Sequence, residues 1–311
     1  MADGSQARDI GADTAAADAA REARAEAPHK PVSVAKAKVA AAEAKAEKGL
    51  PAHASRQVKA GSAFHEFEVD VWITNFHSVV FGLFKHERNK AKSRQFTSDM
   101  DIFAEVIENG ERTGLLGYRE ELWKQKTGMD KRLVFKLFNE TLNWRATMDL
   151  MLARSLQLTY GAQGTPVIAF SANLNDHEFM VYLERSAHKY PFMPENWSFT
   201  ILEDGVPQFF RLRRDIIDFA GDYTLYNQQD DVIGRITGRL LSFGNWRGRI
   251  KREQADKRLV MVLQLFCGML AFNRGCRKHL KALAADVAAG RIKPKIEKQE
   301  CDLYLNPRRV R

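Results

Sequence analysis

Apolar and polar residues alternate where the first aromatic residues of the chain appear. Every second residue from Phe67 to Ile73 is apolar, and the intervening positions hold Glu66, Glu68, Asp70 and Trp72. This period of two predicts a strand. Residues 78–84 are predicted to pair with it, and the basic run at 85–94 is predicted to form a loop.

Two helices are predicted next. Ser98 is suited to cap a helix whose first turn holds Asp99 and Asp101, and Asn109-Gly110 is suited to end it. Apolar residues at helical spacing between residues 133 and 152 predict a longer helix from Asp130 to about residue 160.

A strand pattern returns after Pro166. Residues 167–170 and 179–183 are short β-rich runs, followed by a proline-containing loop at 189–197. Residues 199–217 and 223–241 then repeat one pattern at an offset of 24, so that FTI matches YTL, Arg-Leu matches Arg-Ile, and Ile-Ile matches Leu-Leu. A repeat of this kind predicts one unit built twice, here a hairpin. Residues 246–250 add one more predicted strand.

The run from Leu259 to Phe272 is apolar on every side, with Gln264 as its one polar interruption. Such a helix needs burial all round. The run is shorter than the roughly 20 residues that a membrane span requires, so we expect a helix buried in protein. It is predicted to continue to about residue 288, where basic residues suit the carboxyl-terminal half of a helix.

Four features of the repeated hairpins occur together. They are the openings FTI and YTL, the turns LEDG and NQQDD, the return strand Ile233-Gly234-Arg235-Ile236, and the close Leu241-Ser242-Phe243. With the apolar helix that follows, this set resembles the superfamily of tubby-like, phospholipid scramblase and LURP-one-related proteins over about residues 198–275. The resemblance implies a closed antiparallel barrel around a hydrophobic C-terminal helix.

The chain departs from that superfamily at one informative place. Calcium-responsive scramblases carry an acidic segment before their last helix, whereas this chain has the basic KREQADKRLV there. We therefore carry over no calcium site, and no motif maps the phosphoinositide-binding residues of tubby proteins onto this chain. The predicted class is α+β: an antiparallel barrel-like sheet of repeated hairpins around a buried C-terminal helix, with a helical segment before it and a disordered N-terminal tail. An open sheet with the helix on one face remains the alternative.

Composition divides the chain into four parts. Residues 1–60 lack aromatic residues and are rich in Ala, Lys and Glu, which predicts a disordered tail. Residues 64–165 hold the strand pair and helices, either as the first part of the barrel domain or as a separate partner-binding module. Residues 166–288 hold the barrel with its core helix, and residues 289–311 form a basic tail.

The net charge, the cysteines and the lack of catalytic motifs exclude some classes of function but do not select one. The net charge of +9 favours anionic partners, although many soluble proteins of such charge bind none. Three cysteines without metal or redox spacing suit a reducing compartment, and we expect a cytoplasmic location. No nucleophile, zinc or Walker motif occurs, so the sequence selects no reaction and we expect no metal or cofactor.

The candidate anion site is a set of basic residues on the predicted return strands and after them. Side chains two apart on a strand share a face, so adjacent hairpins would gather them into one patch with Trp246 beside it. Arginine suits phosphate because its planar fork donates two parallel hydrogen bonds. The set consists of Arg211, Arg213, Arg214, Arg235, Arg239, Arg247, Arg249, Lys251 and Arg252.

Three functions remain open at this point. The first is a non-enzymatic protein that binds anionic phospholipid headgroups at a membrane surface through this barrel face. The second is a nucleic-acid or ribonucleoprotein component that uses the same face and the tails. The third is an enzyme assembled from distant residues. Solvent-facing arginines without a ligand are the plain alternative, and the oligomeric state is not indicated.

Overall fold

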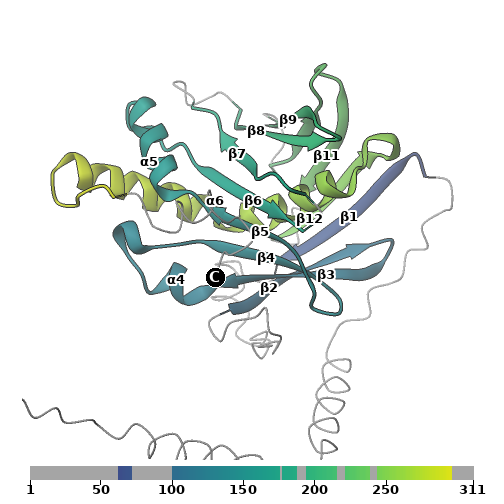
Figure 1. Ribbon diagram of the computed structural model, residues 1–311, viewed down its shortest axis with the longest axis horizontal. Coiled ribbons are helices and arrows are strands. Elements are labelled where there is room, and N and C mark those ends of the chain that lie inside the picture. The colour runs from purple at the N-terminus through teal and green to yellow at the C-terminus, as the bar shows by residue number, and fades with distance from the viewer. Residues whose placement is uncertain are drawn as a thin grey trace, which may run out of the picture. The chain divides into compact units, whose positions relative to one another are not determined.

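The computed structural model describes residues 62–71, 100–175, 177–187, 194–215, 221–238 and 244–295. Within these ranges twelve strands close into one antiparallel barrel, and a long helix runs through it (Figure 1). The predicted tails at 1–60 and beyond residue 295, the predicted strand at 78–84 and the loop at 85–94 lie outside these ranges.

The strands follow one another around the barrel in chain order, and β1 closes it by pairing with β12. Their bounds are β1 Phe64–Val71, β2 Met100–Glu108, β3 Glu111–Arg119, β4 Val134–Asn139, β5 Trp144–Leu150, β6 Ala169–Leu174, β7 Val181–Arg185, β8 Asn196–Glu203, β9 Val206–Arg214, β10 Tyr223–Tyr226, β11 Val232–Gly238 and β12 Asn245–Lys251. Closure removes the exposed edges of the sheet, and the open-sheet alternative is therefore wrong.

The repeated pattern forms the two consecutive hairpins that it predicted, β8–β9 and β10–β11. Asp204 (φ 48°) and Gly205 (φ 82°) make the two-residue turn of the first hairpin. Both angles are left-handed, as a turn that matches the twist of its strands requires. The short strands after Pro166 and the strand around residues 246–250 also occur, as β6, β7 and β12.

The predicted helix over residues 98–109 is wrong, because the described part of this segment is β2. Asn109 (φ 54°) and Gly110 (φ 84°) form the turn between β2 and β3. A helix end and a two-residue hairpin turn both need left-handed residues, so the same Asn-Gly pair serves either structure. The sequence of β2 does not show a clear strand pattern, because two register shifts interrupt its alternation of inward and outward residues.

The predicted helix from Asp130 to residue 160 is also wrong over most of its length. The segment contains β4, β5 and then the shorter helix α5 (Leu152–Gly161). Val134, Phe135, Leu137 and Phe138 are each at most 4% exposed, because β4 is covered on both faces. Apolar residues at neighbouring positions and at three- and four-residue steps then imitate the spacing of a helix.

The core is built around helix α6 (Lys257–Ala288), whose residues from Leu259 to Met269 are all buried. The predicted burial of the apolar run is therefore confirmed. Gln264 donates from Nε2 to Glu108 Oε1 at 2.6 Å, so its amide nitrogen is satisfied inside the protein. Among the helices that the structure describes, α6 alone is long and apolar enough to cross a membrane, but 78% of its most apolar window is buried inside the protein.

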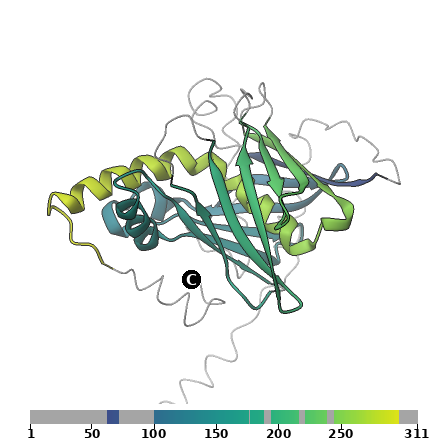
Figure 2. The ribbon, with the colours of Figure 1, turned by 90° about the horizontal axis from the view of Figure 1, so that it is seen from above.

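The carboxyl-terminal half of α6 leaves the barrel beside α5 (Figures 1 and 2). There the Tyr160 hydroxyl donates to the Ala284 carbonyl at 3.1 Å. His279 contacts the carbonyl of Gly128, in the 3-10 turn η2 (Gly128–Asp130), which follows the short helix α4 (Glu120–Lys124). A second 3-10 turn, η3 (Arg252–Gln254), links β12 to α6.

Closure between β1 and β12 depends on one position without a side chain. Gly248 lies opposite Phe67, and a Cβ atom at Gly248 would lie 2.2 Å from the Phe67 ring. Phe67 is itself 2% exposed and has little room to move. We expect Gly248→Ala to lower the free energy of unfolding by about 1–3 kcal/mol, measured by urea denaturation.

Two comparisons test the cause of this loss. Gly161→Ala is the matched control, because nothing lies within 4 Å of its added Cβ, and it should leave stability nearly unchanged. Adding Phe67→Leu to Gly248→Ala should recover part of the loss, since the smaller side chain frees the space. A loss at residue 161 as large as that at residue 248 would contradict the steric explanation.

Candidate functional site

The predicted arginines on the return strands lie on the outside of the barrel. Phe210 and Leu212 point into the core, so Arg211 and Arg213 between and after them face outward. Cross-strand pairing then places Arg213, Thr224, Arg235 and Arg249 in one row across four adjacent strands. We call the outer surface of β9, β11 and β12 the arginine face.

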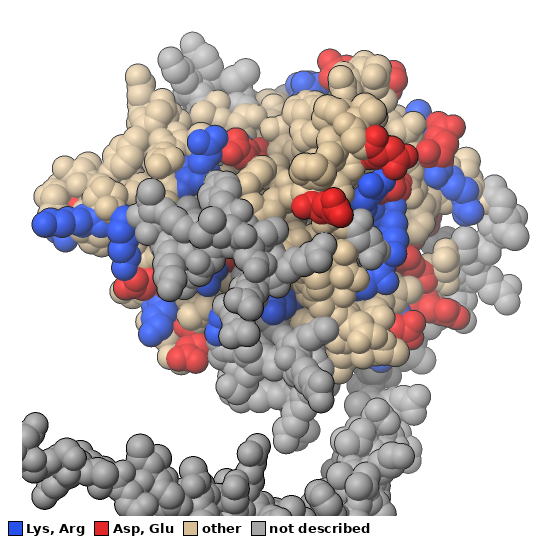
Figure 3. All heavy atoms as spheres, in the orientation of Figure 1, with Lys and Arg blue, Asp and Glu red and all other residues tan. Residues whose placement is uncertain are grey.

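Carboxylates neutralise much of the arginine face. Guanidinium–carboxylate distances are 2.7 Å for Arg211–Asp230, 2.7 Å for Arg235–Asp215, 2.9 Å for Arg249–Glu66 and 3.5 Å for Arg247–Glu68. The space-filling view shows basic and acidic side chains interleaved on the side where β1 and β12 lie (Figure 3). Four of the nine candidates therefore present a paired charge to any ligand.

The other five candidates lie in different surroundings. Arg213 and Lys251 have no ion pair with the described residues, and the guanidinium of Arg214 packs against Gly221. Arg252 donates to the Ser62 carbonyl at 3.0 Å. Arg239 lies outside the described residues.

Trp246 was predicted to lie beside the basic patch, and this prediction is wrong. Residues 245, 247 and 249 of β12 face outward, and Trp246 between them is half-buried against the core. It therefore does not border the arginine face.

A second basic surface was not recognised from the sequence. Exposed cations occupy one side of the protruding half of α6: Arg274, Arg277, Lys278 and Lys281. We call these four residues the α6 strip. Within the described ranges none of them forms an ion pair. Figure 3 shows Lys and Arg side chains at the end of the molecule where α6 protrudes.

The spacing of the α6 strip follows from the opposite face of the helix. Phe272, Cys276, Leu280 and Leu283 are buried at three- and four-residue steps, so the cations between them are turned to solvent. α6 ends at Ala288, as predicted, and the cations lie in its carboxyl-terminal half, although Lys281 is still seven residues before the last helical residue. The dipole acts mainly within the last turn. Helical periodicity of the cations was the signal that could have identified the strip.

A buried polar cluster holds the same end of the barrel together. The Glu195 carboxylate lies 2.8 Å from the Arg185 guanidinium and accepts hydrogen bonds from Tyr223 (3.3 Å) and Asn273 (3.0 Å). Burial is the main cause that lowers the pKa of Arg185 and raises the pKa of Tyr223. The cluster joins β7, β10 and α6, so its role is structural.

The histidine beside the α6 strip carries no charge at neutral pH. Burial, with a smaller contribution from Lys131, lowers the pKa of His279 below its usual value of 6.5. The strip therefore consists of Lys and Arg charges alone.

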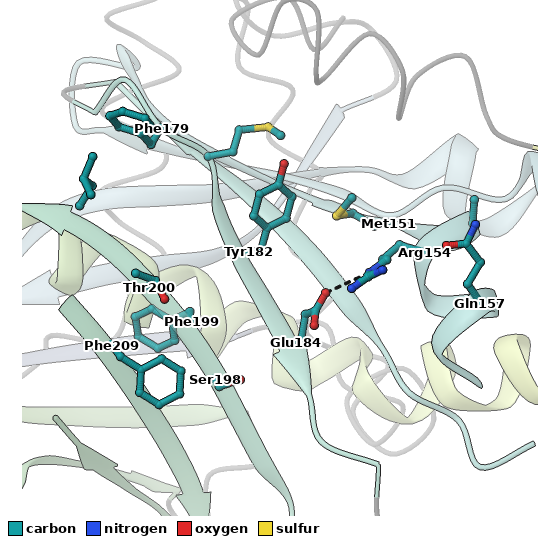
Figure 4. A pocket seen from close by; sticks show the side chains of 13 residues that line it. Met151, Arg154, Gln157, Phe179, Tyr182, Glu184, Ser198, Phe199, Thr200 and Phe209 are labelled. Carbon is teal, nitrogen blue, oxygen red and sulfur yellow. Dashed lines mark hydrogen bonds and ion pairs between the residues drawn. The ribbon is translucent and has the colours of Figure 1, made fainter. Parts of the chain in front are cut away.

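A groove of about 780 Å³ lies on the outer wall between α5 and β7–β9 (Figure 4). It is lined by Met151, Ala153, Arg154, Gln157, Phe179, Met180, Tyr182, Glu184, Ser198, Phe199, Thr200, Leu202 and Phe209. Its residues come from α5, β7, β8, β9 and the segments that precede α5 and β7, so no local pattern in the sequence identifies the groove.

The described residues hold no cluster of three or more His, Cys, Asp or Glu side chains that could bind a metal ion. The buried Cys267 is a core residue, as predicted, and burial raises the pKa of its thiol. The parts of the chain that the structure describes thus offer two basic surfaces and one apolar groove.

Comparison of the chain with protein-family models, with curated proteins and with solved structures found no match in any of the three.

Proposed function

We propose that this protein binds the surface of anionic membranes peripherally, from the cytoplasm, and that the α6 strip makes the main contact. The observation that carries the proposal is a cluster of four exposed cations with no carboxylate partner among the described residues. Their mutual repulsion is unfavourable in the free protein. An external anion relieves it.

The geometry of the strip suits a flat anionic surface. Its four charges lie within eight consecutive helix positions, 274–281, and span about 10 Å along the axis. Tyr160, which is 43% exposed, donates from its hydroxyl to the Ala284 carbonyl, three residues after Lys281 on the same helix. Tyrosine is favoured at membrane interfaces, where its ring contacts the lipid and its hydroxyl stays polar.

The arginine face supports the same function in a secondary role. Arg213 and Lys251 can contribute free charge, while the paired arginines must first exchange a carboxylate for a phosphate. The architecture implied by the resemblance to tubby-like and scramblase proteins, a closed barrel around an apolar C-terminal helix, is the one observed. This agreement also supports the proposal.

The test is sedimentation of the full chain with vesicles of phosphatidylcholine, with and without phosphatidylserine, at low salt. Replacing all four strip residues by Gln should abolish pelleting with the anionic vesicles. Each Lys or Arg at an anionic surface contributes about 1 kcal/mol, so the expected loss is roughly a thousandfold in affinity.

A matched control removes four cations from the arginine face instead, by Arg211→Gln, Arg235→Gln, Arg247→Gln and Arg249→Gln. Because each is already paired with a carboxylate, we expect a much smaller loss. Equal pelleting of the unmodified protein with neutral and anionic vesicles would reject the proposal. So would equal losses in the two variants.

Nucleic acid is the alternative partner, and the same variants address it. Binding of single-stranded RNA that weakens steeply with salt, without pelleting on anionic vesicles, would favour it. Base-stacking proteins use several exposed aromatic residues along their groove. Among the described residues Tyr160 is the one exposed large aromatic that contacts the protruding half of α6, which favours the membrane.

A further inference from the structure

The groove on the outer wall exists because two neighbouring strands part. β7 and β8 pair at two positions, Glu184–Ser198 and Arg185–Trp197, whereas β8 and β9 pair at eight. Beyond Ser198 the edge of β8 receives another partner, since Arg258 from the first turn of α6 donates to the Leu202 carbonyl at 3.2 Å. The separation of the strands is thus built into the fold.

The opening reaches the hydrophobic core. Phe199 and Met151 line the groove and are each 2% exposed. The rim carries the aromatic side chains of Phe179, Tyr182 and Phe209, which are 55%, 36% and 40% exposed. Exposed aromatic residues gathered around an apolar floor are typical of a ligand site.

One end of the groove is polar. Figure 4 shows Arg154 and Gln157 at that end, Phe179 at the other, and Tyr182 between them. Arg154 donates from Nε to Glu184 Oε1 at 3.2 Å. Its two terminal amino groups have no partner among the described residues, so they can donate a pair of hydrogen bonds to a planar anion.

We propose that this groove binds the anion of a long-chain fatty acid. The alkyl chain lies along Tyr182 and Phe199 toward Phe179, and the carboxylate accepts two hydrogen bonds from Arg154. The volume of about 780 Å³ is within the usual range for small-molecule sites, roughly 300–1,000 Å³. The carboxylate of Glu184 favours a singly charged head over a doubly charged phosphate, because it repels the second charge.

The proposal goes beyond membrane binding, since no residue of the α6 strip takes part. Its test is calorimetric titration of the full chain with oleate below the micelle concentration, beside the uncharged oleyl alcohol. We expect saturable binding of one oleate, and roughly tenfold or more weaker binding of the alcohol.

Two substitutions locate the ligand. Arg154→Gln should weaken oleate binding roughly tenfold or more and leave the alcohol unchanged, because it removes the charged donor alone. Arg249→Gln is the matched control: its side chain is similarly exposed, 51% against 45%, and also paired with a glutamate. Thr200→Trp places an indole in the groove and should abolish binding of both ligands.

A chain-length series needs no variant and so does not depend on their folding. Fatty acids of increasing length should bind roughly fourfold more tightly for each added CH2 group until the groove is filled. No saturable oleate binding, no dependence on chain length, or equal effects of Arg154→Gln and Arg249→Gln would each overturn the proposal. Displacement of oleate by an extended apolar peptide that binds more tightly would assign the groove to a peptide instead.

The two proposals fail separately. Thr200→Trp should still pellet with anionic vesicles, and the fourfold α6 variant should still bind oleate. Loss of vesicle binding in Thr200→Trp would show that the groove, and not the strip, makes the membrane contact.

Discussion

Glu195→Ala is expected to lower the free energy of unfolding by about 3–5 kcal/mol, the usual result of breaking a buried ion pair from one side. Arg185 is 9% exposed and would keep its charge without a carboxylate partner, with only the Pro166 carbonyl, among the described residues, to accept from it. Tyr223 and Asn273 would each lose their acceptor at the same time. Urea denaturation followed by far-ultraviolet circular dichroism measures the change.

The matched control for this prediction is Glu66→Ala. Glu66 pairs with the exposed Arg249 at 2.9 Å, and an exposed pair contributes at most about 1 kcal/mol. If the two substitutions destabilise the protein equally, the buried cluster does not hold β7, β10 and α6 together. The cluster would then be incidental to the position of the helix.

Phe266→Ala should have a comparable effect, about 3–5 kcal/mol, for a different reason. Phe266 is fully buried in α6, with its ring centroid 5.8 Å from that of Trp197 and 5.2 Å from that of Tyr223. Truncation removes these contacts and leaves a cavity that a closed barrel cannot collapse to fill. The urea midpoint and the cooperativity of the transition are the measurements.

Phe179→Ala provides the comparison, because this ring is 55% exposed on the rim of the groove. Its loss should change stability by about 0.5 kcal/mol or less. Similar losses at residues 179 and 266 would argue against α6 as the centre of the core.

The two basic surfaces differ in how many of their cations are paired with carboxylates. The arginine face has more cations, but cross-strand neighbours bring carboxylates to four of them. The α6 strip has fewer cations, and their neighbours on that side of the helix include no acid that pairs with them among the described residues. Free charge, rather than total charge, determines how strongly a surface attracts an anion.

The sequence by itself determined the elements whose pattern is complete within one segment of the chain. The repeated hairpins depend on period-two alternation and on short turns such as Asp204-Gly205, and α6 on a long apolar run. Both kinds of signal are complete within one segment. The basic residues of the return strands could also be placed on the outer face from alternation alone.

Only the tertiary structure decided the rest. β4 looks helical because it is buried on both faces, and its second cover comes from elsewhere in the chain. The ion pairs of the arginine face depend on register between strands, such as Arg249 with Glu66, that are far apart in sequence. The groove depends on where the β7–β8 ladder ends. Each of these features is a relation between segments, and no single segment carries the information that specifies it.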